Sequence, residues 1–247
     1  MLYNDFPPSS DMFNQLPDVH DQPEVSDNDL LKLGAVFQKH NVTDKYMLGL
    51  LHRHYPLGKG EMAVTSDIAK NVSVTRATKI TSAADRSLRG QLYYLNVAAE
   101  EWQAYEFEDG PAVKFDPAFL TDLAAEVVQL GLVNMISLGS SKNSLGTREM
   151  QIGEKATVSI AQDSQGPQWN LDTDVKVKVV GWGFVEENST IMIATYVGHA
   201  TSDVSGNHMV LYTANNCSYT SGFLPESDLY PSKIVELLIA QGWLKAD

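Results

Sequence analysis

The chain has 247 residues, of which 43% are hydrophobic and 20% charged, and its formal net charge is −13. This length and composition are typical of a globular protein with a substantial core. The acidic balance, without a cluster of Lys or Arg, argues against nucleic acid or an anionic membrane as a partner, because phosphate contacts need grouped cations. No stretch approaches the roughly 20 apolar residues of a membrane span.

Residues 1–25 are predicted to form an extended acidic arm. The segment is rich in proline, lacks periodicity and contains no Lys or Arg. Phe6, Phe13 and Leu16 are apolar anchors, so we expect the arm to dock on the body of the protein. The arm lacks the basic and apolar regions of a signal peptide, and Cys217 is the only cysteine, so we expect a cytoplasmic protein without an intramolecular disulfide.

The first half of the body is predicted to open with a helix over 27–40, capped by Ser26. An apolar strand follows and ends in His52-Arg53-His54. A turn over 56–60 and a partner strand over 61–65 would complete a β-hairpin. Weaker strand patterns cover 72–80 and 103–108.

The second half begins with the clearest helix, 117–130, which has Asp116 as its cap and Gly131 after its end. The rest of the chain is predicted to contain, in order, a strand over 132–138, an antiparallel meander over 175–179, 190–198 and 207–213, and a final helix over 231–241. No internal repeat is evident. We therefore predict a single α+β domain over 26–247, in which a largely antiparallel curved sheet is packed by two or three helices.

His52 and His54 are the leading candidates for catalysis. Side chains two residues apart in an extended segment share a face, so the two imidazoles are expected to stand together while Arg53 faces away. Such a pair can transfer protons, orient a substrate or bind a metal. The alternative is that both histidines are polar residues at the end of a strand, with no chemical role.

A second pair, His199 and His208, would lie nearly opposite across a hairpin if the residues between them form its loop. With the first pair it would offer a site for a divalent metal, which Asp203 or Cys217 could complete. A protein without any cofactor is the favoured prediction, because His-x-His spacing alone is weakly specific.

Substrate contacts are predicted from residues close to the first histidine pair and from aromatic residues. The candidates are Arg53, Tyr55, Trp102 and Tyr105, which would line a pocket for a small molecule. Glu106 and Glu108 alternate with aromatic residues, and we interpret them as the solvated face of a strand.

The runs Gly49-Leu-Leu-His-Arg-His-Tyr-Pro-Leu57 and Glu61-Met-Ala-Val64 resemble a motif of uncharacterised proteins from filamentous fungi. The segment Trp102-x-x-Tyr-Glu-Phe107 and the helix leading to Gly131 are also similar, so the resemblance covers about residues 45–137. It implies a fungal source, and no activity is established for that group.

The favoured function is a small-molecule enzyme of fungal metabolism, primary or secondary. Lyase, isomerase or cyclase chemistry at His52 and His54 fits best, because no nucleotide or flavin fingerprint is present. Two alternatives remain open: a binding or interaction protein without catalysis, and a metalloenzyme that uses two or more of the histidines.

Overall fold

The computed structural model describes residues 10–83, 86–140, 147–161, 175–202 and 230–240. The helices are α1 (Ser10–Gln15), α2 (Asp27–Lys39), α3 (Ile80–Ala83), α4 (Pro117–Gln129) and α5 (Pro231–Ala240). The strands are β1 (Met47–Leu50), β2 (Glu61–Ala69), β3 (Val72–Lys79), β4 (Leu88–Asn96), β5 (Glu101–Asp109), β6 (Ile136–Gly139), β7 (Thr147–Gly153), β8 (Ala156–Ile160), β9 (Val175–Glu187) and β10 (Thr190–Ser202).

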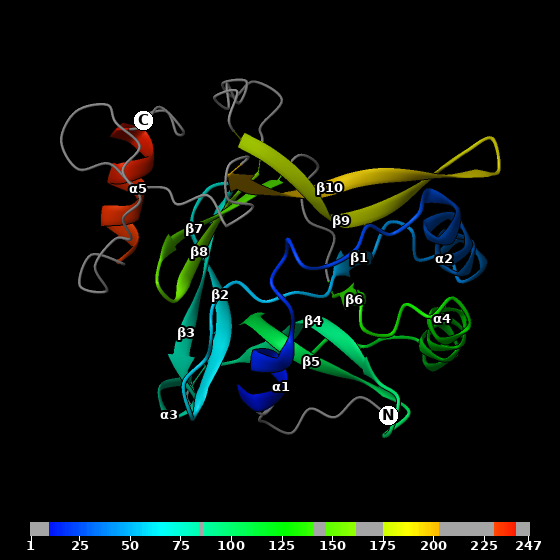
Figure 1. The fold of residues 1–247 in the computed structure, drawn as a ribbon, viewed down its shortest axis with the longest axis horizontal. Coiled ribbons are helices and arrows are strands. Elements are labelled where there is room, and N and C mark those ends of the chain that lie inside the picture. The colour runs from blue at the N-terminus through cyan, green and yellow to red at the C-terminus, as the bar shows by residue number, and fades with distance from the viewer. Residues whose placement is uncertain (1–9, 84–85, 141–146, 162–174, 203–229, 241–247) are drawn as a thin grey trace.

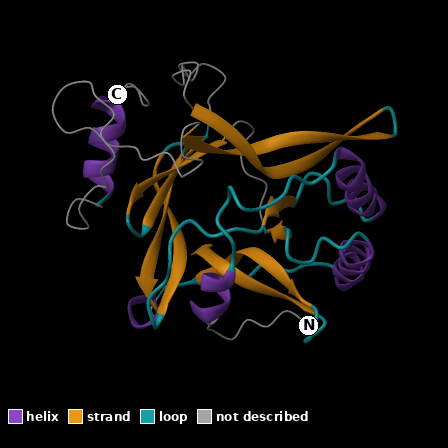
Figure 2. Cartoon of the chain, in the orientation of Figure 1, coloured by secondary structure: helices purple, strands orange, loops and turns teal. Residues whose placement is uncertain are grey.

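The strands form one closed barrel in the order β1-β6-β4-β5-β2-β3-β8-β7-β10-β9. Most neighbours are antiparallel, and the parallel pairs are β2 with β5 and β7 with β10. Figures 1 and 2 show α2 and α4 together on one side of the strands and α5 on another. The predicted α+β class is confirmed, but the sheet is more than curved: it closes on itself, because β9 pairs with β1.

The predicted hairpin between the histidine segment and residues 61–65 is wrong. Strand β1 pairs with β6 and β9, whereas β2 pairs with β3 and β5. The chain leaves the barrel sheet after Leu50, and Arg53 instead forms a parallel bridge with Asp18 of the N-terminal arm. The third strand expected over 207–213 lies outside the described residues.

The barrel consists of two halves with the same order of elements, although the sequence shows no evident repeat. The first half runs from α2 to β5 and the second from α4 to β10; each contains a helix, a short strand and two hairpins, and the first half has the additional short helix α3. The halves meet where β3 pairs with β8 and where each short strand lies between the halves: β1 pairs with β6 and β9, and β6 also pairs with β4. Each first hairpin turns through two residues, since Ala69 pairs with Val72 and Gly153 with Ala156.

The helices of the two halves end in the same way, which supports this correspondence. Asn41 after α2 and Gly131 after α4 both have positive φ, at 53° and 70°. The next residues, Val42 and Leu132, donate to the carbonyls of Phe37 and Val127. These are Schellman motifs, which direct the chain back toward the barrel. Because residues after Gly131 complete this turn, β6 begins at Ile136, later than the predicted residue 132.

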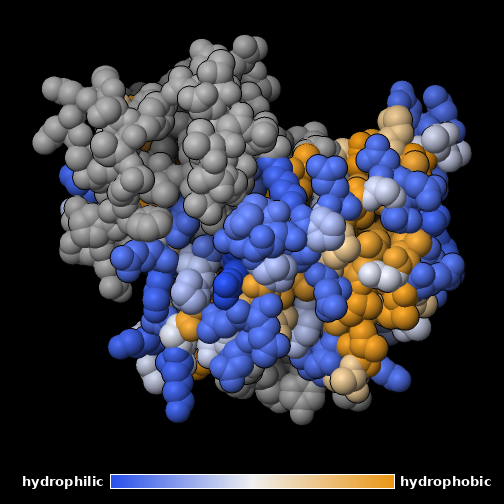
Figure 3. All heavy atoms as spheres, in the orientation of Figure 1, coloured by the Kyte–Doolittle hydropathy of each residue, from blue (hydrophilic) through white to orange (hydrophobic). Residues whose placement is uncertain are grey.

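The caps predicted for both helices are present. The side chain of Ser26 accepts from the Asp29 backbone N–H, and that of Asp116 accepts from Ala118. The buried faces of α2 and α4 then pack on the outside of the barrel, where Phe37 contacts Phe119 and Phe184 at ring separations of 5.1 and 4.9 Å. Figure 3 shows apolar residues also gathered on the outer surface of these two helices.

Part of the barrel has a polar interior and an apolar exterior. On β7, Thr147 and Glu149 line an internal cavity, while the alternate residues Met150 and Ile152 pack outward in a cluster that includes Leu238 of α5. Strands β3 and β8 alternate in the same sense. Because α5 covers the apolar outer residues of these strands, their polar residues point into the barrel.

The N-terminal arm contains α1 and is docked along the part that the structure describes. Phe13 and Leu16 are buried against Tyr55, Leu57 and Tyr105, whereas Phe6 lies outside the described residues. In Figure 1 the chain between α1 and α2 runs across the ring of strands. Among the described helices, none has the length and apolar character that a membrane crossing requires.

Candidate metal centre

Three histidines and one glutamate converge beside the internal cavity: His52, His54 and Glu149 line it, and the buried His199 packs against the two other imidazoles. His52 and His54 come from the segment after β1, Glu149 from β7 and His199 from β10. One potential ligand atom from each residue lies within 4.8 Å of the others. His199 is fully buried, and the side chains of His54 and Glu149 are 3% and 13% exposed. We call these four residues the His–Glu site.

The sequence reasoning correctly anticipated that His52 and His54 share a side, although these residues follow a strand instead of belonging to it. The Arg53 N–H donates to Pro17 O, so the segment stays extended and its side chains alternate. The rings of His52 and His54 are 4.6 Å apart. Arg53 lies outside the cavity lining and donates to Asn14 O at 2.6 Å.

The N-terminal arm holds this segment in position. The Asn14 side chain accepts from the Leu57 N–H at 2.7 Å and donates to Leu57 O at 2.8 Å. Gln22 donates to the carbonyls of Leu51 and Asn134. These contacts bracket the histidines, so the arm fixes the backbone from which both imidazoles project.

The His52 ring has a defined orientation. Its Nδ1 lies 2.7 Å from Leu50 O, and because a carbonyl can only accept, Nδ1 carries the proton. In the neutral ring the lone pair is therefore on Nε2. Metal-binding histidines commonly have one nitrogen held by a carbonyl in this way, which sets the tautomer and the direction of the other nitrogen.

Glu149 contacts two of the imidazoles. His54 Nε2 lies 3.4 Å from its Oε1, and His199 Nδ1 lies 3.4 Å from its Oε2. Burial disfavours the charged carboxylate, but the charges of His54 and His199 outweigh burial and hold the pKa of Glu149 well below its usual range. The site thus has an ionised carboxylate at neutral pH.

Glu149 was missed because no strand was predicted over Thr147–Gly153, the segment that forms β7. The signal available was Thr147-x-Glu149-x-Gln151, three polar residues on one face. His199 was a candidate metal ligand, but Glu149 was not identified as its neighbour. The parallel pairing of β10 with β7 places His199 directly opposite Glu149. Irregular pairing near Val197 adjusts the local register of β10 before His199. His208, Asp203 and Cys217 lie outside the described residues.

The cavity beside the His–Glu site has a volume of about 340 Å³, at the lower end of the range for small-molecule pockets. Tyr105 lines it, whereas Tyr55 and Trp102 do not belong to its lining. Tyr55 packs against Phe13, and Trp102 donates to Leu120 O at 3.2 Å in the core beneath α4. Of the three aromatic residues predicted to contact a substrate, Tyr105 therefore lines the cavity, whereas Tyr55 and Trp102 pack in the core.

Glu106 also lines the cavity, so its interpretation as part of a solvated strand face is wrong. It is 4% exposed, because both faces of β5 are covered at this position. Burial, with a contribution from the charge of Glu149, raises the pKa of Glu106 to about 8. Glu108 is different: it is partly buried and pairs with Arg89 at 2.8 Å.

Comparison with known proteins gives no precedent for this site, since the chain matches no protein-family model, no curated protein and no solved structure.

Proposed function

We propose that the protein binds one divalent transition metal at the His–Glu site and acts as a metal-dependent enzyme on a small molecule in the barrel cavity. The observation that carries this proposal is the convergence of three buried imidazoles and a carboxylate within 4.8 Å, of which His52, His54 and Glu149 line the cavity. Burying these groups together is costly unless they bind one another or an ion. The same fungal metabolism that the sequence motif suggests would supply the substrate.

The spacing of the ligand atoms supports a shared ion. Donor atoms about 2.1 Å from a tetrahedral metal lie about 3.4 Å apart. Glu149 has this separation from both imidazoles, through a different oxygen in each case: Oε1 lies 3.4 Å from His54 Nε2, and Oε2 lies 3.4 Å from His199 Nδ1. Binding would draw the remaining donor atoms slightly closer, since the full set extends to 4.8 Å.

The donor set also favours particular metals. Imidazole suits zinc, copper, iron and nickel, and a carboxylate adds affinity for manganese and iron. Four protein ligands would complete a tetrahedral zinc site, which is typical of a structural role. An ion that accepts five or six ligands would keep positions open toward the cavity. Because the proposed role is catalytic, we favour iron(II), manganese(II), cobalt(II) or nickel(II), while zinc is the ion whose tetrahedral spacing the 3.4 Å contacts match.

The test is metal analysis of protein purified without an affinity tag, followed by titration of the metal-free protein with each ion. We expect about one ion per chain and at least a roughly 100-fold weaker affinity in the His199→Ala variant. His20→Gln is the matched control, because His20 is exposed and contacts only acidic side chains of the arm. Absence of binding by all five ions, zinc included, would refute the proposal.

Metal-free acid–base catalysis is the second candidate, and the 3.4 Å contact between His54 and Glu149 favours it. A buried carboxylate can orient an imidazole and stabilise its charged form, as lyase, isomerase or cyclase chemistry requires. The double variant His52→Gln, His54→Gln tests this candidate, since Gln can form hydrogen bonds but cannot titrate near neutral pH. Once a substrate is found, full activity of that variant would exclude both candidates.

A further inference from the structure

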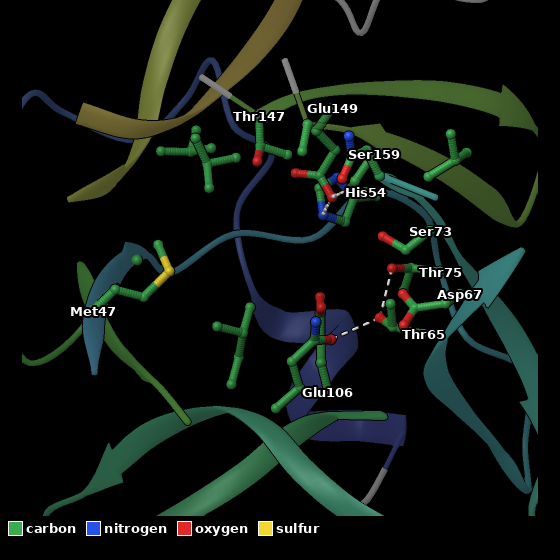
Figure 4. Close-up of a pocket in the computed structure, with 18 of the residues that line it drawn as sticks. Met47, His54, Thr65, Asp67, Ser73, Thr75, Glu106, Thr147, Glu149 and Ser159 are labelled. Carbon is green, nitrogen blue, oxygen red and sulfur yellow. Dashed lines mark hydrogen bonds and ion pairs between the residues drawn. The ribbon is translucent and has the colours of Figure 1, made fainter. Parts of the chain in front are cut away.

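Glu106 is a second ionisable group in the cavity, apart from the four residues of the His–Glu site. It lies in β5, between Ala63 of β2 and Leu92 of β4. Figure 4 shows its side chain rising into the cavity on the side opposite His54 and Glu149. Two functional groups thus face each other across one cavity.

The packing of the barrel does not account for a carboxyl group at this position. Glu106 is 4% exposed, and no cation among the described residues forms an ion pair with it. A buried carboxyl without a cation costs folding free energy, and a Leu or Met would fill similar space without that cost. Residues kept at such a cost are frequent at functional sites.

The surroundings of Glu106 supply hydrogen-bonding groups on the same side of the cavity. Thr65 Oγ1 lies 2.7 Å from Thr75 Oγ1 and donates to Gln91 Oε1 at 2.6 Å. All three residues line the cavity with Glu106, and Figure 4 labels the two threonines beside it. A ligand that reaches this side would meet hydroxyl, amide and carboxyl groups, while Met47 and Leu92 cover part of the remaining wall.

We propose that Glu106 is a proton-donating catalytic residue, and that the substrate is a small oxygenated molecule whose carboxylate or carbonyl group is held at the His–Glu site while a second oxygen faces Glu106. This inference rests on the proposed metal centre. It defines the substrate class as compounds with two oxygen functions, such as hydroxy, keto or dicarboxylic acids, small enough for a cavity of about 340 Å³.

The protonation state of Glu106 agrees with this role. With a pKa of about 8, its carboxyl group carries a proton at neutral pH and can donate it. In the reaction the proton passes from Glu106 to the substrate oxygen that faces it, which leaves a carboxylate. Water at the cavity opening returns a proton, so the step needs no oxidant or reductant.

The experiment uses the full chain loaded with cobalt(II) and the dicarboxylates oxalate, malonate and succinate as probes of increasing length. Two variants of similar size separate hydrogen bonding from packing: Glu106→Gln keeps a donor, and Glu106→Met removes it. Glu108→Gln is the control on the same strand. Binding of each probe is followed by the visible spectrum of the cobalt ion.

We expect all variants to bind cobalt(II) like the wild type. At pH 7, at least one probe should bind the wild type and Glu106→Gln with similar affinity and Glu106→Met roughly tenfold more weakly, as expected for a lost hydrogen bond to a charged group. Raising the pH through 8 should weaken binding to the wild type more than to Glu106→Gln. Normal cobalt binding with equal probe affinity in all variants would overturn this inference alone; failure of the wild type to bind cobalt would overturn the metal centre as well.

Discussion

His199 and Glu149 lie directly opposite each other in the parallel pairing of β10 with β7, with Nδ1 and Oε2 3.4 Å apart. The pairing of two backbones thus sets the position of two potential metal ligands from distant parts of the sequence. His52 and His54 reach the same place from a segment held by the N-terminal arm. The His–Glu site therefore depends on strand register and on arm docking at once.

Glu149→Gln should weaken metal binding by at least about 100-fold, because it removes the only anionic ligand of the His–Glu site. Titration of the metal-free protein with cobalt(II) would measure the loss. Glu154→Gln, an exposed position in the turn of the same hairpin, is the matched control and should bind like the wild type. Equal affinities in the two variants would show that Glu149 is not a ligand.

Glu106→Gln should stabilise the metal-free protein in a pH-dependent manner. The pKa of Glu106 is raised from 4.5 to about 8 in the folded state. Below pH 4.5 Glu106 is protonated in both the folded and the unfolded wild type, so its ionisation does not change the free energy of unfolding relative to the variant. Between these values only the unfolded wild type releases the proton, so the free energy of unfolding of the wild type falls by about 1.4 kcal/mol per pH unit relative to the variant.

Urea unfolding of both proteins from pH 4 to pH 9 would measure this difference. The advantage of Glu106→Gln should grow from pH 4.5 and level off above about 8. A difference that is constant across this range would mean that Glu106 ionises normally in the folded protein.

Asn14→Ala should weaken metal binding without touching a ligand. The Asn14 side chain holds both backbone groups of Leu57, and its carbonyl accepts from Arg53. Loss of the side chain frees the segment that carries His52 and His54, so we expect roughly tenfold weaker cobalt(II) binding, comparable to the loss of an outer-shell contact. Gln38→Ala, which removes a side chain–backbone contact far from the site, should leave the affinity unchanged.

Removal of residues 1–25 should lower the melting temperature, because the arm buries Phe13 and Leu16 in the body. Phe13→Ala alone should reduce the free energy of unfolding by about 3–5 kcal/mol, as is usual for a buried aromatic residue. Differential scanning calorimetry of both proteins gives the comparison. If the truncated chain melts at the wild-type temperature, the arm contributes no net stability.

The helices α2, α4 and α5 were predictable from the sequence because their signals are local, whereas the short helices α1 and α3 were not predicted. Ser26, Asp116 and Gly131 mark helix ends through contacts within a few residues, and α2 and α4 begin and end within a residue or two of the predicted limits. Barrel closure was not predictable in this way. It depends on pairs such as Gly49 with Gly181, which are far apart in the chain.

The candidate site was predictable only in part for the same reason. Alternation in an extended segment correctly placed His52 and His54 together. Glu149 and Glu106 lie on strands whose polar face points inward, and local alternation cannot distinguish a polar interior from solvent. Whether the polar face points inward depends on what covers the apolar face of the strand. For β7 the apolar face is covered by Ile234 and Leu238 of α5, which lie more than 80 residues later in the chain than Met150 and Ile152.

The repeated architecture of the barrel has a consequence for how the protein holds together. Each half contributes two members of the His–Glu site, His52 and His54 from the first and Glu149 and His199 from the second. A bound ion would act as a cross-link between the two similar halves, and by mass action it would stabilise the folded barrel over the unfolded chain. Removal of the ion by a chelator would then weaken the contact between the two halves. The concentration of metal in the cell would therefore influence the lifetime of the folded protein as well as its activity.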